Sequence, residues 1–221
     1  MGKRGPKPKG KVKIKWSPDF AYAIGLIATD GNLSKDDRHI SFVSKDKEQI
    51  LNFLKGLKIT VPISKSFSGY RGKIAFRVQF SDVNFYQFLN SIGLFGAKSK
   101  TIGELKIPDE FFFDFLRGCF DGDGTIYSYW DKRWKSSFMF YVSFITASVV
   151  FVSWLRNSIY KHTSVFGHLK KDGRGITYQL TYAKSDSLEI LKKMFRHKKI
   201  LSLSRKKLKI EKILAIVGER L

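Results

Sequence analysis

The chain carries two copies of one short apolar segment, and this repeat limits the folds open to it. The first copy is Ala21–Asn32 (AYAIGLIATDGN) and the second is Phe115–Thr125 (FLRGCFDGDGT). Each has a glycine five positions before its last Asp and another directly after it. The last acids, Asp30 and Asp123, lie 93 positions apart. A repeat at this spacing indicates a tandem duplication, so the sequence predicts two similar halves.

Each copy predicts a helix buried at the centre of the fold, because a helix that is apolar almost all round must be covered. Gly25 and Gly118 would let two such helices approach closely. A glycine ends each helix, so Asp30 and Asp123 would lie together at helix C-termini, where an acid is disfavoured by about 0.3–1 kcal/mol. Two carboxylates and unpaired carbonyls form an oxygen-ligand site suited to Mg²⁺.

The segments Ala23–Gly31 (AIGLIATDG) and Leu116–Gly124 (LRGCFDGDG) resemble the two copies of the LAGLIDADG motif. Over about residues 17–210 the chain is similar to the single-chain LAGLIDADG homing endonucleases, which have two fused halves. The resemblance implies a monomer with an α+β fold of two pseudo-symmetric αββαββα halves. Their motif helices would pack at the centre, and two antiparallel four-stranded sheets would form a DNA-binding saddle.

The composition favours a polyanionic partner. Lysine and arginine total 41 against 19 acidic residues, a formal net charge of +22, which favours nucleic acid; a generic basic surface is the alternative. The single cysteine, Cys119, excludes a disulfide framework and a cysteine-based zinc site. Without an 18-residue apolar run or an apolar signal region, we expect no membrane partner and no secretion, and residence in the cytoplasm or an organellar matrix.

The repeat and the composition shifts predict four segments. Residues 1–16 form a basic flexible arm, 17–95 the N-terminal half, 96–110 a linker, and 111–221 the C-terminal half. Ser17 and Pro18 are typical of a helix start. In the arm, Arg4–Lys9 would lie along phosphates or in a minor groove, or serve only as a solubilising tail.

Strand patterns repeat with a second spacing. In Lys73–Phe80 (KIAFRVQF) apolar and polar residues alternate, so Ile74 and the other apolar side chains are expected in the core. Val142–Phe144 matches Ile40–Phe42 at an offset of 102, nine more than the motif offset. The nine extra residues are expected within Tyr127–Ser137, as a longer first hairpin.

Basic and amide side chains on the open strand faces are candidate DNA contacts, because these residue types can read purine edges in a major groove. The alternative is an ordinary solvated strand face. The candidates are Arg38, Ser41, Lys65, Lys73, Arg77 and Gln79 in the first half, and Lys170, Arg174, Thr177, Gln179 and Thr181 in the second. Arg133 and Lys135, in the longer first hairpin, would contact phosphates.

The resemblance also implies an activity: Mg²⁺-dependent hydrolysis of both strands of double-stranded DNA at a long specific target, with Mn²⁺ or Ca²⁺ as substitute ions. Asp30 and Asp123 would bind the metal, assisted by the carbonyls of Thr29 and Gly122. The first copy departs from the motif at Ala28 and Thr29. Asp121 has no role in this scheme and is expected to be a solvated or capping residue.

Lys98–Thr101 (KSKT) resembles a segment that often precedes the second motif in this family, where a lysine reaches toward the active site. The resemblance implies that Lys98 or Lys100 would stabilise developing charge near the scissile phosphate, with a solvated charge as the alternative. Arg205 or Lys206 is the candidate counterpart in the second half. Two other functions stay open, an intron RNA maturase and a transcriptional regulator. Both last acids are present and no length is spare for a helix-turn-helix domain, which favours the endonuclease over the regulator.

Overall fold

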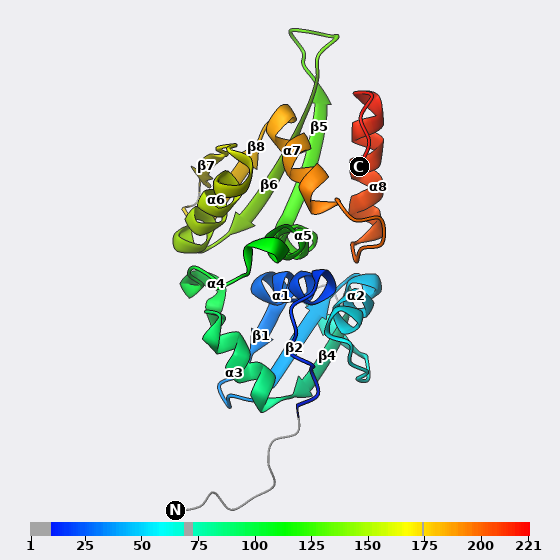
Figure 1. Cartoon of the computed structure of the whole chain (residues 1–221). Coiled ribbons are helices and arrows are strands. Elements are labelled where there is room, and N and C mark those ends of the chain that lie inside the picture. The colour runs from blue at the N-terminus through cyan, green and yellow to red at the C-terminus, as the bar shows by residue number, and fades with distance from the viewer. Residues whose placement is uncertain (1–9, 69–72, 174) are drawn as a thin grey trace, which may run out of the picture.

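The structure, a computed structural model, describes residues 10–68, 73–173 and 175–221. It consists of two halves stacked on each other, with one helix of each half at the centre (Figure 1). The first half contains α1 (Pro18–Asp30), β1 (Gly31–Leu33), β2 (His39–Ser44), α2 (Lys47–Leu57), β3 (Ser64–Ser68), β4 (Lys73–Ser81) and α3 (Val83–Ser91).

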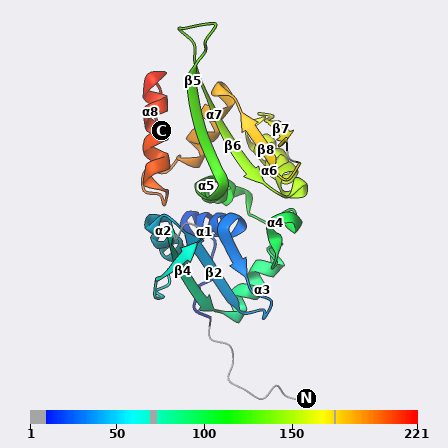
Figure 2. The ribbon, with the colours of Figure 1, turned by 180° about the vertical axis from the view of Figure 1, so that it is seen from behind.

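The second half repeats this order after a connection that contains α4 (Lys98–Thr101) and a 3-10 turn, η1 (Asp109–Phe111). Its elements are α5 (Phe112–Asp123), β5 (Gly124–Trp130), β6 (Phe138–Thr146), α6 (Val149–Thr163), β7 (His168–Lys171), β8 (Tyr178–Tyr182) and α7 (Lys184–Met194). A last helix, α8 (Ser204–Ile216), lies beside β5, as both views show (Figures 1 and 2).

Each half has one antiparallel four-stranded sheet, in the orders β1-β2-β4-β3 and β5-β6-β8-β7. The registers confirm the spacing of 102: Ser41 faces Gln79 in the first sheet, and Ser143 faces Thr181 in the second, with both residues of the pair shifted by 102. β5 has seven residues where β1 has three. The predicted fold class and the longer first hairpin are confirmed.

The motif helices pack as closely as their glycines allow. Ser17 caps α1 by accepting a hydrogen bond from the amide of Phe20. A Cβ atom added at Gly25 would lie 2.2 Å from the carbonyl oxygen of Phe115, and one added at Gly118 would lie 2.1 Å from that of Tyr22. Only glycine leaves room for backbone contact at this crossing.

Ile74 departs from the alternation predicted for its strand, because it is 50% exposed and not in the core. The pairing of β4 with β2 begins only at Phe76, so Ile74 lies where the sheet is two strands wide and less of the molecule covers it. Val78 and Phe80, further along β4, are buried as expected.

Residues 10–16, assigned from sequence to the basic arm, contact the first half. The amides of Lys11 and Val12 donate to one carboxylate oxygen of Asp82, and Val12 is buried. Trp16 packs its ring against Phe20. The proposed DNA-contacting stretch of the arm lies outside the described residues. Among the described helices, none combines the length and the apolar character that a membrane crossing requires.

Candidate active site and nucleic-acid interface

The C-terminal ends of α1 and α5 meet at the centre of the molecule. Asp30 is the last residue of α1 and Asp123 the last of α5, and both are exposed. A Cβ atom added at Gly122 would lie 2.0 Å from Thr29 Oγ1 and 3.1 Å from Asp30 Oδ2. The close glycine crossing therefore brings the last turn of one helix against the acid of the other.

Both acids are harder to ionise than a free aspartate. Loss of hydration raises the pKa of Asp30 to about 6, and the negative charge of Asp123 adds to the effect. Loss of hydration also raises the pKa of Asp123, against the lowering effect of Lys206 and Lys98. Two carboxylates in this situation gain when a cation is bound between them.

Lys98 reaches the end of α1. Its side chain is 6% exposed, and Nζ donates to the carbonyl oxygens of Thr29 (3.2 Å) and Gly31 (2.5 Å). Burial lowers the pKa of Lys98, and the negative charges of Asp30 and Asp123 oppose this effect. An ammonium group at a helix C-terminus also stabilises the negative end of the helix dipole.

Lys206 does the same for α5. Its Nζ donates to the carbonyls of Phe120 (2.6 Å), Gly122 (3.2 Å) and Gly124 (2.7 Å). Burial lowers its pKa to about 8, with the negative charge of Asp121 opposing the change. The two helix ends therefore carry equivalent sites, each with one acid and one lysine.

The other two basic candidates lie differently. Lys100 is exposed on α4. Arg205 binds Asp46 through Nε (3.0 Å) and Nη2 (2.8 Å). Of the two candidate pairs, the structure therefore brings Lys98 and Lys206 to the acids. Lys100 faces solvent and Arg205 binds Asp46.

The donors at the helix ends fit a hard divalent cation. Asp30 and Asp123 offer carboxylate oxygens, and the carbonyls of Thr29 and Gly122 lie in the same turns, although each accepts a hydrogen bond from a lysine. Among the described residues no group of three or more His, Cys, Asp or Glu could hold a metal. A cation here would keep waters or take phosphate oxygens as its other ligands, as Mg²⁺ prefers.

The open face of the first sheet carries three of the predicted DNA contacts. The register puts Ser41, Arg77 and Gln79 on one face, with Arg77 opposite Val43. Arg77 and Gln79 are exposed, and Arg77 Nη2 donates to Gln79 Oε1 at 2.5 Å. Ser41 is on this face but buried.

Three first-half candidates are placed elsewhere or lie outside the description. Lys65 is opposite Phe76, so it projects from the other face of the sheet. Arg38 is exposed in the turn before β2, where its Nε lies 3.4 Å from a carboxylate oxygen of Asp36. The side chain of Lys73 lies outside the described residues, as does Arg174 in the second half.

The open face of the second sheet is linked by side-chain hydrogen bonds that meet at Ser143. The hydroxyl oxygens of Ser143 and Thr181 are 2.9 Å apart, and Gln179 Nε2 donates to Ser143 Oγ at 3.2 Å. Lys170 lies opposite Gln179. Thr177, at the outer end of this face, donates from Oγ1 to Asp172 at 2.8 Å.

Arg133 and Lys135 are exposed in the turn between β5 and β6. That hairpin projects beyond the rest of the second half (Figures 1 and 2). Both cations are therefore placed to meet a partner that extends along the sheet away from the helix ends.

No protein-family model and no curated protein matches the sequence. Solved structures do match. The LAGLIDADG homing endonuclease I-LtrWI has a TM-score of 0.61 at 11% identity, over 90% of each chain. Full-length DUF199/WhiA from Thermatoga maritima has a TM-score of 0.59 at 15% identity, over 93% of this chain, which spans 62% of the length of that protein. I-DmoI has a TM-score of 0.52 at 14% identity, over 81% of this chain and 98% of its own. This chain has the LAGLIDADG fold.

Within this LAGLIDADG fold the second motif helix has a buried carboxylate that the sequence did not reveal. Asp121 was expected to be solvated or a cap, but it is 2% exposed. Its Oδ2 accepts hydrogen bonds at 2.7 Å from the Tyr22 hydroxyl and at 2.7 Å from the Leu203 amide. Asp121 thus ties both motif helices to the segment that leads into α8 and Lys206.

Arg117 is a second hidden anchor, with no exposed surface. Its Nη1 pairs with Asp114 at 2.8 Å and donates to the carbonyl of Met194, while Nε donates to the carbonyl of Leu201. The first LAGLIDADG copy has Ala21, Ile24 and Ala28 where the second has Asp114, Arg117 and Asp121. The sequence signal that could have revealed these anchors is a charged residue in one copy where the other copy has an apolar residue at the equivalent position.

Proposed function

We propose that the protein is a site-specific endonuclease that hydrolyses both strands of double-stranded DNA with a divalent metal ion. The observation that carries the proposal is the duplicated site, in which Asp30 with Lys98 and Asp123 with Lys206 occupy equivalent positions on adjoining helix ends. Two equivalent sites in one chain suit a substrate with two antiparallel strands, so a monomer suffices for both cuts.

The overall charge and the related structures support a duplex substrate. A net charge of +22 provides the attraction to phosphates that dominates DNA affinity. I-LtrWI was solved bound to target DNA, and I-DmoI in complex with DNA and Mn. The exposed polar faces of both sheets lie on either side of the paired helix ends, so a duplex along the sheets would pass over the acids.

Different residues of the chain would bind the metal, stabilise charge and hold the duplex. Asp30 and Asp123 would hold Mg²⁺, which when bound polarises a phosphate and lowers the pKa of a bound water. Lys98 and Lys206 keep a positive charge beside each acid, where it would offset negative charge that develops on the phosphate. Arg77, Gln79 and Gln179 would hold the duplex in register through base edges.

The test separates binding from cleavage. Duplexes bound by the protein would be selected from a randomised library in Ca²⁺, and the selected duplexes then incubated with Mg²⁺. We expect cleavage of both strands, lost in Asp30→Asn and Asp123→Asn while binding in Ca²⁺ persists. Glu104→Gln, which changes an exposed acid away from the helix ends, is the matched control and should cleave normally.

Two results would contradict the proposal. Tight, specific duplex binding without cleavage in Mg²⁺ or Mn²⁺ would exclude the nuclease and favour a regulator. Failure to enrich any duplex would exclude the DNA substrate, and structured intron RNA would then be tested.

A further inference from the structure

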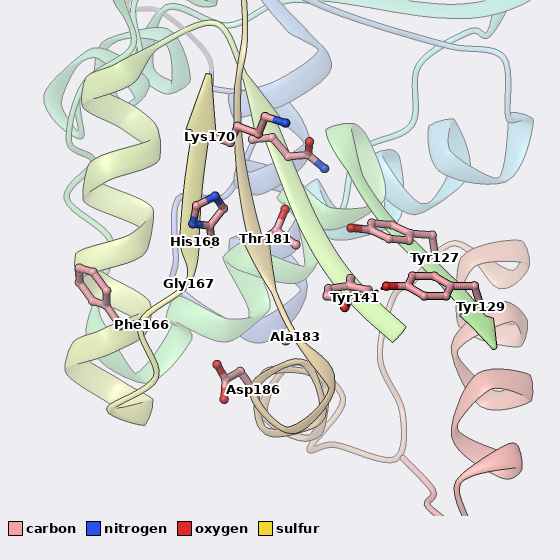
Figure 3. A pocket seen from close by; sticks show the side chains of 11 residues that line it. Tyr127, Tyr129, Tyr141, Phe166, Gly167, His168, Lys170, Thr181, Ala183 and Asp186 are labelled. Atoms are coloured by element: carbon pink, nitrogen blue, oxygen red, sulfur yellow. Dashed lines mark hydrogen bonds between the residues drawn. The ribbon is translucent and has the colours of Figure 1, made fainter. Parts of the chain in front are cut away.

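Three tyrosines form a stacked row on the open face of the second sheet (Figure 3). The ring of Tyr141, on β6, lies 5.1 Å from that of Tyr127 and 6.0 Å from that of Tyr129, both on β5, and the ring planes are within 14° of parallel. Tyr127 is 38% exposed and Tyr129 46% exposed. The row therefore presents aromatic surface to whatever lies on this face.

The row forms one wall of a hollow of about 610 Å³. Gln179, Thr181, Lys170 and His168 line the rest of its sheet side (Figure 3). The hydroxyls of Tyr129 and Tyr141 are 3.3 Å apart, and this contact raises the pKa of Tyr141 to about 12. The wall is thus uncharged at neutral pH and apolar over its ring faces.

The described residues of the first sheet form no equivalent row. β1 ends at Leu33, so nothing in it corresponds to Tyr127 or Tyr129, and the shift of 102 puts His39 where the second sheet has Tyr141. The described part of that face has the Arg77 guanidinium beside Gln79 instead. The nine-residue insertion has given the two halves different surface chemistry.

This difference matters in a major groove. A guanidinium pairs with the acceptors of guanine, whereas the feature that an apolar surface can meet there is the 5-methyl group of thymine. Aromatic rings packed on the polar edge of a G·C pair would leave hydrogen-bonding groups without partners, which costs free energy. The tyrosine row is therefore suited to thymine-rich sequence.

We propose that Tyr127, Tyr129 and Tyr141 recognise thymine 5-methyl groups in the half of the target that lies on the second sheet. The inference rests on the proposed duplex substrate. Tyr127 follows Asp123 by four residues and Tyr129 by six, so at about 3.3 Å per residue they lie about 13–20 Å along the strand. At about 3.4 Å per base pair this places the contacted thymines about four to six pairs from the helix ends.

The test replaces thymine by uracil, which removes only the methyl group. Duplexes selected in Ca²⁺ are remade with uracil at one position at a time, and their affinities are measured. We expect about a fourfold loss for each contacted methyl, the effect of one buried methyl or methylene group. The loss should be confined to these positions of the second half-site, and uracil in the first half-site should have no effect.

Variants assign the effect to the rings. The double variant Tyr127→Ser, Tyr129→Ser keeps hydroxyls but removes two of the three rings, so it should lose most of the preference for thymine over uracil. The matched double variant with Phe at both positions keeps the rings and should still prefer thymine. Arg77→Gln, on the other sheet, should weaken both duplexes alike and leave the preference unchanged.

Equal affinity of the unaltered protein for thymine and uracil throughout the second half-site would overturn the inference while leaving the proposed nuclease intact. Mismatches at these positions would leave the bases unpaired. If such mismatches raised the affinity and the methyl group had no effect, the inference would also be overturned and the row assigned to base stacking. Absence of any duplex binding would overturn both proposals.

Discussion

Replacing Gly25 by alanine tests the close approach on which the whole arrangement depends. The added Cβ would lie 2.2 Å from the Phe115 carbonyl oxygen and 2.9 Å from the Gly118 Cα, whereas ordinary contact begins at 3.4 Å. The helices must therefore separate by about 1 Å, which forfeits a quarter to a half of the dispersion energy of atoms in contact there. Overpacking costs about 1–3 kcal/mol, while alanine regains about 1 kcal/mol of helix propensity.

These two terms leave a net loss of up to about 2 kcal/mol in the free energy of unfolding. We expect the upper end because surrounding side chains such as Tyr22 and Leu26 are fully buried and have nowhere to move. Urea denaturation followed by circular dichroism measures it, with an unchanged m-value as the check that the same surface unfolds. Gly173→Ala, where an added Cβ meets nothing within 4 Å, should shift stability by less than about 0.5 kcal/mol. A Gly25→Ala protein as stable as the parent would refute the close crossing.

Three further outcomes follow from the charges. Asp30→Asn, measured without metal, should raise stability by about 1 kcal/mol above pH 6, a figure reduced for solvent screening from the raised pKa of about 6. The destabilisation of the parent is fully present above that pKa and falls as the native carboxyl group takes up a proton, so the difference between the two proteins should vanish as the pH falls from 6 to about 4 in denaturation series. Lys206→Met should slow Mg²⁺-dependent cleavage of the selected duplex about 100-fold with Ca²⁺ binding kept, whereas Arg205→Met should change the cleavage rate little. Arg117→Met should cost about 3 kcal/mol in urea denaturation, the lower end of the range for a broken buried ion pair, because the buried Asp114 carboxylate would keep only the partly exposed Arg196 as a partner.

The fold could be predicted from sequence because it depends on the spacing of residue types along the chain. The repeated glycine and the apolar run determined the helix pair, and the alternation of Lys73–Phe80 with its shift of 102 determined the sheets. These signals depend on neighbouring residues, whose spacing is read directly along the chain. Ile74 was misplaced because its burial depends on how far β2 extends beside it, which the pattern of one strand does not contain.

The choice between neighbouring basic residues required the structure. Arg205 and Lys206 are adjacent, and on a helix adjacent side chains point about 100° apart. The rotation of α8 about its own axis therefore decides which of the two side chains meets the acids. No helix was predicted from sequence for that segment, which forms α8. The role of Asp121 depends on contact with Leu203, 82 positions away, and no local pattern reports such a contact.

Comparison of the two copies suggests why only the second motif helix has buried charged residues. Lys98 lies in a connection held at both ends by chain that continues into a folded half, with Ser148 bonded to the Ile102 carbonyl. Lys206 lies at the start of α8, and contacts with the connection between α7 and α8 help to offset the entropy of ordering it. Arg117 and Asp121 provide these contacts, which explains why the first copy needs none at the corresponding positions.

A strand-specific assay tests this account. Asp121→Ala removes the acceptor of the Leu203 amide, a hydrogen bond to a charged group that contributes about 1.5–3 kcal/mol. Looser tethering of the tail should withdraw Lys206 from one site and leave Lys98 in the other. We expect cleavage of one labelled strand to slow at least about tenfold relative to the other, so that nicked duplex accumulates. Tyr22→Phe, which removes one hydroxyl but keeps the Leu203 contact, is the matched control. Equal slowing of both strands in Asp121→Ala would show that the buried carboxylate supports the helix pair as a whole and does not place Lys206.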